Sequence, residues 1–271
     1  PPFVHRGTAR SYPFGRIVYG GDTVGRGVGS RRMHPATRAL LAAQQIQDPI
    51  EIHSDWLTVG HVDEFISFLP GAGGSHGWKV MIAAPARALQ IVLAQPDATP
   101  LFHGADMGMP HLFSPGNLIG DDFPLRTVGH IRANAAFRGL QTTVNTLIDN
   151  VKTTKLMPEL NLVAADCIEI PILFTKNGFR HIAYNPGSVN MLVITEGGGN
   201  RLIVPKPYGP FVGGHCLFGQ AITGKIGDVA LSIDYVDDMQ SYHTGQGEIH
   251  CGSNSQRTPQ TDRWWDLPWI V

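Results

Sequence analysis

The chain has 271 residues, of which 42% are hydrophobic and 16% are charged, and its formal net charge at pH 7 is -1. This length can bury the core of one large domain or of two smaller ones. The balanced charge argues against a nucleic-acid partner, because phosphate binding requires a clustered cationic surface, and no run of about 18 apolar residues predicts a membrane span.

The first third of the chain alternates short apolar runs with helix-like stretches. Strands, each followed by Gly, Pro, Ser or Asp, are predicted over residues 16–19, 50–53, 62–69 and 79–84. Helices are predicted over residues 34–46 and 86–93. In the first of these helices the apolar residues lie at helical spacing and are expected to form a buried stripe: Leu40, Leu41, Ala43 and Ile46.

The middle of the chain contains an irregular segment and then a long helix. Residues 95–127 are rich in Pro, Gly and Asp and lack periodicity, so we expect an irregular insertion there. A helix is predicted over residues 132–155. Its apolar residues fall on one face, at Leu140, Val144, Leu147, Ile148 and Val151.

The last third of the chain is richer in strands. They are predicted over residues 167–171, 190–194, 201–205 and 229–233. Residues 211–221 are interpreted as a connection or a short helix. The repeated grouping of strands and helices predicts an α/β fold, although the periodicity alone does not specify how the sheets are arranged.

Cys251 is the leading candidate for a catalytic residue. It follows His250 and lies between Gly247 and Gly252, and small neighbours keep a sulfur atom accessible. The competing interpretation is a buried core cysteine, which is common for this residue type. Cys216, which follows His215, is a rival nucleophile.

The remaining cysteine, Cys167, lies in an apolar run and is interpreted as structural. Three cysteines allow at most one disulfide, so disulfides do not hold this fold together.

A second candidate group consists of His61 and Asp63. Two residues apart in a strand, they would lie on one face and could serve acid–base catalysis, metal binding or cation recognition. The alternative is an ordinary solvent-facing polar surface. Because neither C-x-x-C nor H-E-x-x-H occurs, we favour a cysteine enzyme over a zinc enzyme and predict no metal site in this chain.

Several segments resemble the protein-arginine deiminases in the same order along the chain. The central active-site segment of that family resembles SDWLTVGHVDEFISF at residues 54–68, and its nucleophile segment resembles GEIHCGSN at residues 247–254. Further similarity lies at residues 6–7, 12–17, 190–193, 203–210, 242–243 and 264–265. The resemblance runs almost end to end and fails mainly in the insertion near residues 95–127.

The resemblance implies a fold and an activity. Those enzymes convert peptidyl-arginine into peptidyl-citrulline and ammonia through a cysteine S-alkylthiouronium intermediate. Their catalytic domain is a pentein, an α/β propeller of five modules, and residues 1–271 would form the C-terminal part of it, roughly three modules. Cys251 would be the nucleophile, His61 the general acid and base, and Asp63 a carboxylate that binds the guanidinium. Val59 would contribute backbone contacts near the substrate.

The resemblance also implies that part of the site lies outside this chain. The family's second guanidinium-binding carboxylate and its calcium ligands lie upstream of the position that matches Pro1, and the chain begins without methionine. We therefore expect an N-terminal companion chain from the same precursor, with a truncated sequence as the alternative. Calcium is a candidate cofactor with ligands upstream, and no cofactor is expected in this chain.

Three other functions remain open at this point. One is a pentein hydrolase or amidinotransferase that acts on free arginine or another small guanidine. Another is a non-catalytic module that binds arginine-containing peptides through Asp63 and leaves Cys251 unused. The third is a metal-dependent hydrolase built on His61 and Asp63. The low charge content favours a secreted or extracellular protein, with the cytoplasm as the alternative.

Overall fold

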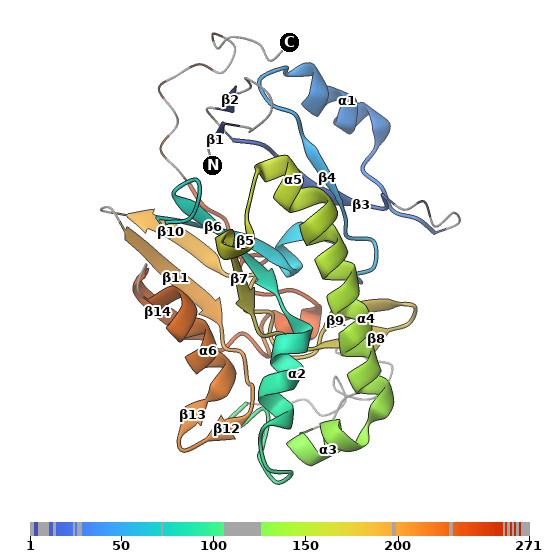
Figure 1. The fold of residues 1–271 in the computed structure, drawn as a ribbon, viewed down its shortest axis with the longest axis vertical. Coiled ribbons are helices and arrows are strands. Elements are labelled where there is room, and N and C mark those ends of the chain that lie inside the picture. Colours follow the sequence, from blue (N-terminus) through green and yellow to red (C-terminus); the bar gives the residue numbers. More distant parts are fainter. Residues whose placement is uncertain are drawn as a thin grey trace.

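The protein is mixed α/β, with its strands distributed over several small sheets (Figure 1). A computed structural model describes residues 3–4, 11–12, 15–23, 25, 29–71, 73–105, 126–196, 199–227, 230–256, 258, 261, 263 and 266. The mixture of helices and strands confirms the predicted α/β class. Among the described residues, no helix is long and apolar enough to cross a membrane.

The N-terminal part forms a small parallel unit. Strands β3 (Val18–Gly21) and β4 (Ile50–His53) pair in parallel, and helix α1 (Pro35–Ala43) connects them. A short antiparallel pair, β1 (Phe3–Val4) with β2 (Ser11–Tyr12), precedes this unit.

Helix α1 differs from its prediction in length and in burial. It buries no residue, and Leu40 is 64% exposed, so the expected stripe does not pack on the core. The helix also ends earlier than predicted, because Gln45 adopts a left-handed backbone conformation (φ 56°) that interrupts helical hydrogen bonding.

Two three-stranded sheets share one topology. In each sheet an antiparallel pair is followed by a helical connection and then by a third strand parallel to the second. The strands of the first sheet are β5 (Ile66–Pro70), β6 (Trp78–Ala83) and β7 (Cys167–Ile170). Those of the second are β10 (Leu192–Glu196), β11 (Gly199–Pro205) and β14 (Ala230–Val236).

The connections within these sheets contain most of the helices. Between β6 and β7 the chain forms α2 (Pro85–Leu93), α3 (Val128–Ala133), α4 (Ala135–Val151), a π-helical turn (Lys152–Leu156) and α5 (Met157–Leu160). Between β11 and β14 a hairpin, β12 (Phe211–Val212) with β13 (His215–Cys216), leads into α6 (Leu217–Ile226). A further hairpin, β8 (Phe174–Asn177) with β9 (Arg180–Ala183), lies between the two sheets in sequence.

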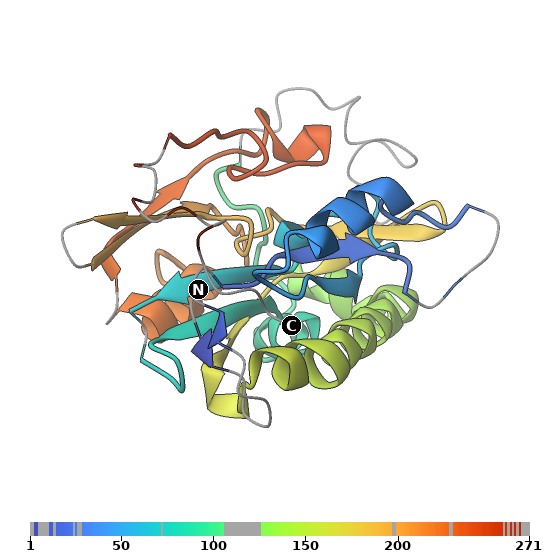
Figure 2. The ribbon, with the colours of Figure 1, turned by 90° about the horizontal axis from the view of Figure 1, so that it is seen from above.

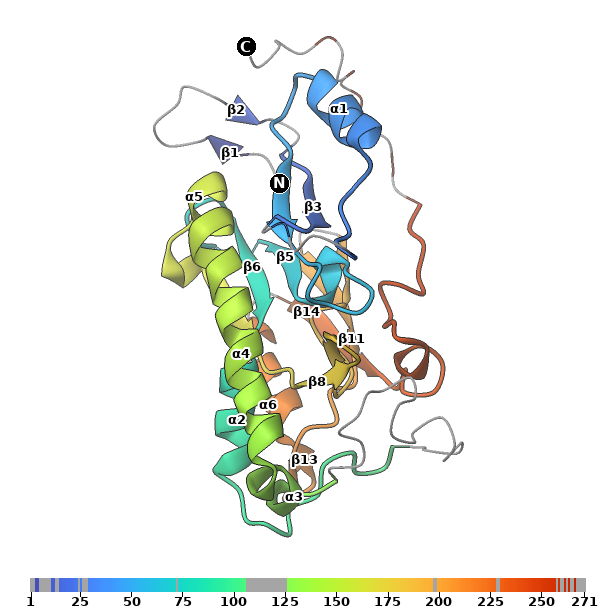
Figure 3. The same ribbon diagram turned by 90° about the vertical axis from the view of Figure 1, so that its right-hand side faces the viewer.

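The main core lies between α4 and the strands. Val144 and Ile148 of α4 are buried together with Val80 and Ile82 of β6, which confirms the apolar face predicted for this helix. Helix α4 runs along one side of the molecule, and the segment that follows β14, residues 237–251, lies on the opposite side (Figures 2 and 3). Helices α2 and α4 pack against one another on this side of the strands, whereas α1 lies apart from them.

Two predicted elements prove to be divided in the structure. The helix predicted over residues 132–155 is two helices, because Asn134 leaves the helical conformation and its side chain accepts a hydrogen bond from the Phe137 N–H at 2.9 Å. The connection predicted over residues 211–221 contains the β12–β13 hairpin and the first part of α6. Of the predicted insertion, residues 106–125 lie outside the described residues, and the rest is mostly irregular.

The prediction of a strand over residues 62–69 was wrong in its first half. Val62–Glu64 form a 3₁₀ turn, and strand β5 begins only at Ile66. The Glu64 carboxylate accepts a hydrogen bond from the His61 N–H at 2.7 Å, which closes the chain into a turn rather than leaving it extended. His61 and Asp63 consequently do not share a strand face, although both remain beside one another at the end of this sheet.

Candidate active site

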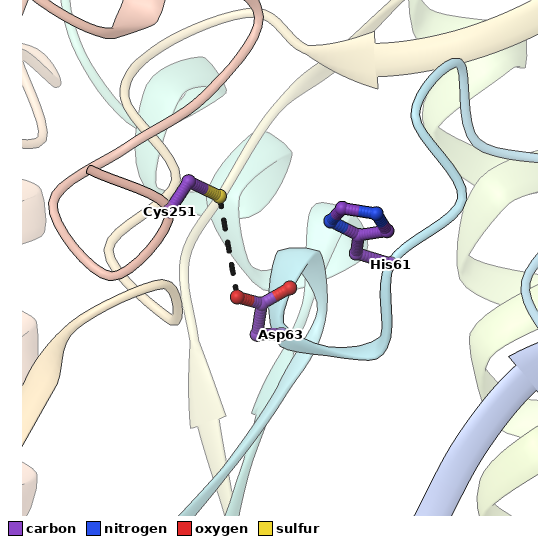
Figure 4. A group of neighbouring side chains, drawn as sticks. All are labelled: His61, Asp63 and Cys251. Atoms are coloured by element: carbon purple, nitrogen blue, oxygen red, sulfur yellow. Dashed lines mark hydrogen bonds between the residues drawn. The ribbon is translucent and has the colours of Figure 1, made fainter. Parts of the chain in front are cut away.

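The structure brings His61, Asp63 and Cys251 together from two distant segments. Their nitrogen, oxygen and sulfur ligand atoms all lie within 4.8 Å of one another. In Figure 4 the Cys251 sulfur points toward the Asp63 carboxylate, and the His61 ring lies on the other side of that carboxylate. The Asp63 Oδ2–Cys251 Sγ distance is 4.0 Å. An imidazole, a carboxylate and a thiol thus surround one solvent-accessible point.

The loop that precedes His61 is held by an arginine. Arg31 donates hydrogen bonds to Asp55 Oδ1 at 2.6 Å, to Thr58 O at 2.6 Å and to Val59 O at 3.1 Å. Gly60 then adopts φ 90°, where a side chain would be strained and its Cβ would lie 3.0 Å from the Arg31 guanidinium. This clamp turns the chain so that His61 faces the site.

A second arginine, from the β8–β9 hairpin, also binds Asp55. Arg180 donates to Asp55 Oδ1 at 3.0 Å and to Asp55 O at 2.9 Å.

The predicted contact between Val59 and a substrate remains a prediction. Its carbonyl oxygen already accepts a hydrogen bond from Arg31, so a substrate would have to use the Val59 N–H or share that oxygen.

Glu64 is a titratable group in the same turn that the sequence did not single out. Burial raises the pKa of its carboxyl to about 7, and the nearby Asp63 charge acts in the same direction. Hydrogen bonds from the His61 and Gly60 N–H groups oppose this shift because they favour the ionised form. The Glu64 carboxyl group, which titrates near neutral pH, is therefore a neighbour of Asp63.

The Cys251 loop is fixed in place by Asn190. The Asn190 Oδ1 atom accepts hydrogen bonds from the backbone N–H groups of His250 (3.1 Å) and Cys251 (3.3 Å), and Asn190 Nδ2 donates to the Cys251 sulfur at 3.4 Å. Gly252 packs against the Tyr242 ring, where an added Cβ would lie 2.4 Å from ring carbons. Any larger residue at this position would displace the turn that carries the sulfur.

Without a bound cation, the surroundings of Cys251 favour its protonated thiol. Burial raises the pKa of the Cys251 thiol above its ordinary value, and the Asp63 and Glu64 charges raise it further. Hydrogen bonds from the backbone and from Asn190 act in the opposite direction. Asp63 itself has a partner, because His250 Nδ1 lies 2.7 Å from Asp63 Oδ2. A bound cation at Asp63 would therefore favour the thiolate.

Two buried acidic residues, Asp238 and Glu248, lie close to the Cys251 loop. Glu248 Oε1 lies 2.7 Å from His243 Nδ1 and accepts a hydrogen bond from the Gly187 N–H at 2.9 Å. Asp238 is only 1% exposed. Burial raises the pKa of Asp238 to about 9, and the Glu248 charge adds to the shift. Asp238 is thus protonated at neutral pH.

This pair predicts a pH dependence of stability that Asp238→Asn should remove. The folded state keeps a proton on Asp238 up to about pH 9, whereas the unfolded chain releases it near the ordinary aspartate pKa of 3.8. Its stabilising contribution is therefore complete below about pH 4 and is lost as the pH rises toward 9. The asparagine cannot ionise and has nearly the shape of the neutral carboxyl group, so the variant should become more stable than the wild type as the pH rises.

The measurement is the melting temperature of both proteins between pH 5 and pH 9. The matched control is Asp234→Asn on β14, since Asp234 is exposed and should leave the wild-type slope unchanged. Equal slopes for Asp238→Asn and the wild type would contradict a buried proton at this position.

The other two cysteines lie away from this group. Cys216 ends β13 and borders a separate cavity with Tyr235 and Asp237, and the structure does not bring it to His61 and Asp63. Cys167 begins β7, where burial raises the pKa of its thiol.

One group of described side chains has the composition and spacing to hold a metal ion. Among the described residues, His61, Asp63 and Cys251 are the one group of His, Cys, Asp and Glu residues close enough to share an ion. A set with one sulfur and one nitrogen does not fit Ca²⁺, which takes six to eight oxygen ligands.

Three residues of this site were not assigned a role from the sequence: Glu64, Asn190 and His250. In the sequence, Asn190 only begins a segment similar to the family, and His250 only precedes Cys251. Their contacts join residues about 60 and 187 positions apart, so local pattern could not reveal them.

The chain is similar to known proteins along almost its whole length. A family model described as protein-arginine deiminase matches residues 1–266. The chain is 34% identical over 272 residues to protein-arginine deiminase type-4 of Mus musculus, covering 98% of this chain and 38% of that protein. It is 33% identical to the type-1 protein of Homo sapiens (98% and 37% covered) and 34% identical to the human type-3 protein (98% and 38%). The chain thus spans less than two-fifths of the length of these relatives.

Proposed function

Because the chain belongs to the protein-arginine deiminase family, we propose that it carries the reacting groups for conversion of peptidyl-arginine into peptidyl-citrulline and ammonia. The observation that carries this proposal is the convergence of His61, Asp63 and Cys251 within 4.8 Å. A carboxylate for a cation, a nucleophile and a proton carrier are the groups that this hydrolysis requires.

Recognition begins with the guanidinium. A planar guanidinium offers paired N–H donors, and the Asp63 carboxylate can accept two parallel charge-assisted hydrogen bonds. The substrate must compete with His250, which now lies 2.7 Å from Asp63 Oδ2. Bound at Asp63, the guanidinium carbon would lie beside the Cys251 sulfur, because the carboxylate and the sulfur are 4.0 Å apart. Its positive charge would offset the Asp63 charge that raises the thiol pKa.

In the first chemical step, the Cys251 thiolate attacks the guanidinium carbon and forms a C–S bond. His61 as an imidazolium donates its proton to the departing nitrogen, the C–N bond breaks, and ammonia leaves. The product is a covalent S-alkylthiouronium. In the second step, neutral His61 takes a proton from water as the water oxygen attacks the same carbon. The C–S bond then breaks, the second proton of the water oxygen passes to solvent, citrulline is released, and the thiolate is regenerated.

The wider fold is proposed to be part of a pentein propeller. Its support is the repeated topology, in which the β3–β4, β5–β6–β7 and β10–β11–β14 sheets each contain a parallel pair joined by a helical connection. We take residues 1–271 as one region with roughly three of the five modules. We propose that the remaining modules, and the second carboxylate for the guanidinium, lie in sequence N-terminal to this region, either on a companion chain or on a longer form of this chain. Any calcium ligands would lie there too, since the described cluster does not fit that ion.

The substrate class can be tested with two small molecules. The native protein, together with any companion chain, should form citrulline from an N-acylated arginine amide with a higher kcat/KM than from free arginine. Free arginine brings an α-ammonium and an α-carboxylate that must lose water on entering the site, whereas the amide brings neutral groups. An equal or higher kcat/KM for free arginine would contradict a peptidyl substrate and favour a small-guanidine enzyme.

A further inference from the structure

The cluster formed by His61, Asp63 and Cys251 also has the composition of a zinc site. Zn²⁺ is bound in proteins by cysteine sulfur, histidine nitrogen and aspartate oxygen, and this group offers one of each. Softer metals select thiolate and imidazole, whereas Ca²⁺ and Mg²⁺ select oxygen. The ligand chemistry therefore distinguishes zinc from the ions that a carboxylate cluster would attract.

The distances between the ligand atoms are somewhat longer than those of a closed tetrahedral site. With Zn–S near 2.3 Å and Zn–N and Zn–O near 2.0–2.2 Å, tetrahedral ligand atoms lie about 3.3–3.7 Å apart. Here the ligand atoms lie within 4.8 Å, and the Asp63 Oδ2–Cys251 Sγ pair is at 4.0 Å. His61 and Cys251 are exposed and Asp63 is half-buried, so an ion can reach them and small side-chain rotations can close the remaining gap. The fourth position would hold water.

Hydrogen-bonding partners already orient two of the three ligands. His250 Nδ1 lies 2.7 Å from Asp63 Oδ2, and Asn190 donates to the Cys251 sulfur at 3.4 Å. Such outer partners fix the orientation of metal ligands and tune their affinity. Two of the three ligands are therefore held in place by the fold, whereas the exposed His61 ring is able to rotate toward the ion.

We propose that His61, Asp63 and Cys251 bind one Zn²⁺ ion and that this ion inhibits the site. The Cys251 thiol loses its proton to solvent when a Zn–S bond forms, and the sulfur is then no longer available as a nucleophile. Zinc also occupies the carboxylate that would bind the guanidinium. The inhibition rests on the proposed function, whereas the binding does not.

Binding is tested by titrating the intact native protein with Co²⁺, a spectroscopic substitute for Zn²⁺. The expected result is one Co²⁺ per chain with a thiolate-to-cobalt absorption band, which Zn²⁺ abolishes by displacement. Cys251→Ser should weaken Zn²⁺ binding by more than about 100-fold, since even loss of an outer partner of a ligand commonly costs about 10- to 100-fold. His250→Asn, which removes such a partner from Asp63, should show this smaller loss.

The matched control is Cys216→Ser, because Cys216 also follows a histidine but lies away from His61 and Asp63. It should leave Zn²⁺ affinity unchanged, and circular dichroism should show that each variant is folded. Equal affinity in the wild type and Cys251→Ser, or no thiolate band, would overturn the site.

Inhibition is a separate readout. Stoichiometric Zn²⁺ should abolish citrulline formation, and a chelator should restore it. Zinc bound through Cys251 without loss of activity would overturn the inhibition. A lack of citrulline formation in zinc-free protein would instead contradict the proposed function and leave the binding result unaffected.

Discussion

Cys251→Ser is expected to lower the rate of citrulline formation by about 10⁴-fold or more, which is the scale on which loss of a catalytic nucleophile acts. A serine hydroxyl is far harder to ionise than a thiol, and the surroundings of residue 251 already disfavour the anion. Burial and the Asp63 charge raise the pKa of the Cys251 thiol, and they would act on an alkoxide in the same direction. The measurement is kcat/KM on an N-acylated arginine amide.

Cys216→Ser is the control for this experiment, because it removes the other cysteine that follows a histidine. It should retain wild-type kcat/KM. If Cys216→Ser lost activity and Cys251→Ser kept it, the assignment of the nucleophile would be reversed. Activity in both variants would contradict cysteine catalysis altogether.

Asp63→Asn is expected to have two effects of opposite sign. Citrulline formation should fall by about 10²- to 10³-fold, since loss of one partner of a hydrogen-bonded charge pair costs about 2–5 kcal/mol. Alkylation of Cys251 by neutral iodoacetamide at pH 8 should become faster. The Asp63 charge raises the pKa of the thiol, so its removal increases the thiolate fraction.

The opposed effects separate a role in binding from general damage to the site. A misfolded active site would alter both rates in a correlated way, whereas the proposed role predicts a faster alkylation together with a slower deimination. Glu169→Gln, on an exposed position of β7, should change neither rate. Slower alkylation in folded Asp63→Asn would contradict the electrostatic coupling between the carboxylate and the sulfur.

The features that sequence predicts well here are those with regular periodicity. The buried strand Ile50–His53 has its predicted bounds, and the apolar face of α4 is buried as expected, because continuous or periodic apolar residues have few alternatives to burial. The break at Asn134 is a local competition between a side-chain cap and the helix, which periodicity does not report.

Other local signals were present in the sequence but were missed. Asn177-Gly178 is a strong hairpin signal: Asn177 ends β8, and Gly178, at φ 63°, begins the two-residue turn that leads to β9. In α1 the helical spacing of apolar residues was genuine, but nothing in the described structure buries Leu40. Amphipathic spacing thus predicts a helix more reliably than it predicts what the helix packs against.

In this site, sequence motifs identify the reacting residues more reliably than they predict how those residues are arranged. His61, Asp63 and Cys251 were chosen from residue type and from resemblance, and the structure brings them together. The reason given for placing His61 beside Asp63 was wrong, since a 3₁₀ turn closed by Glu64 holds them and not a strand. The supporting contacts of Arg31, Arg180 and Asn190 depend on tertiary structure and could not be read from spacing.

The central claim is that the Cys251 sulfur attacks a guanidinium carbon held at Asp63. It is tested most directly by acid-quenching the native protein during turnover of an arginine peptide and mapping the trapped adduct by mass spectrometry. The account predicts an adduct on Cys251 with the mass of the peptide minus ammonia, absent in Cys251→Ser and strongly reduced in Asp63→Asn. Citrulline formation through an adduct on Cys216 or Cys167 would contradict it.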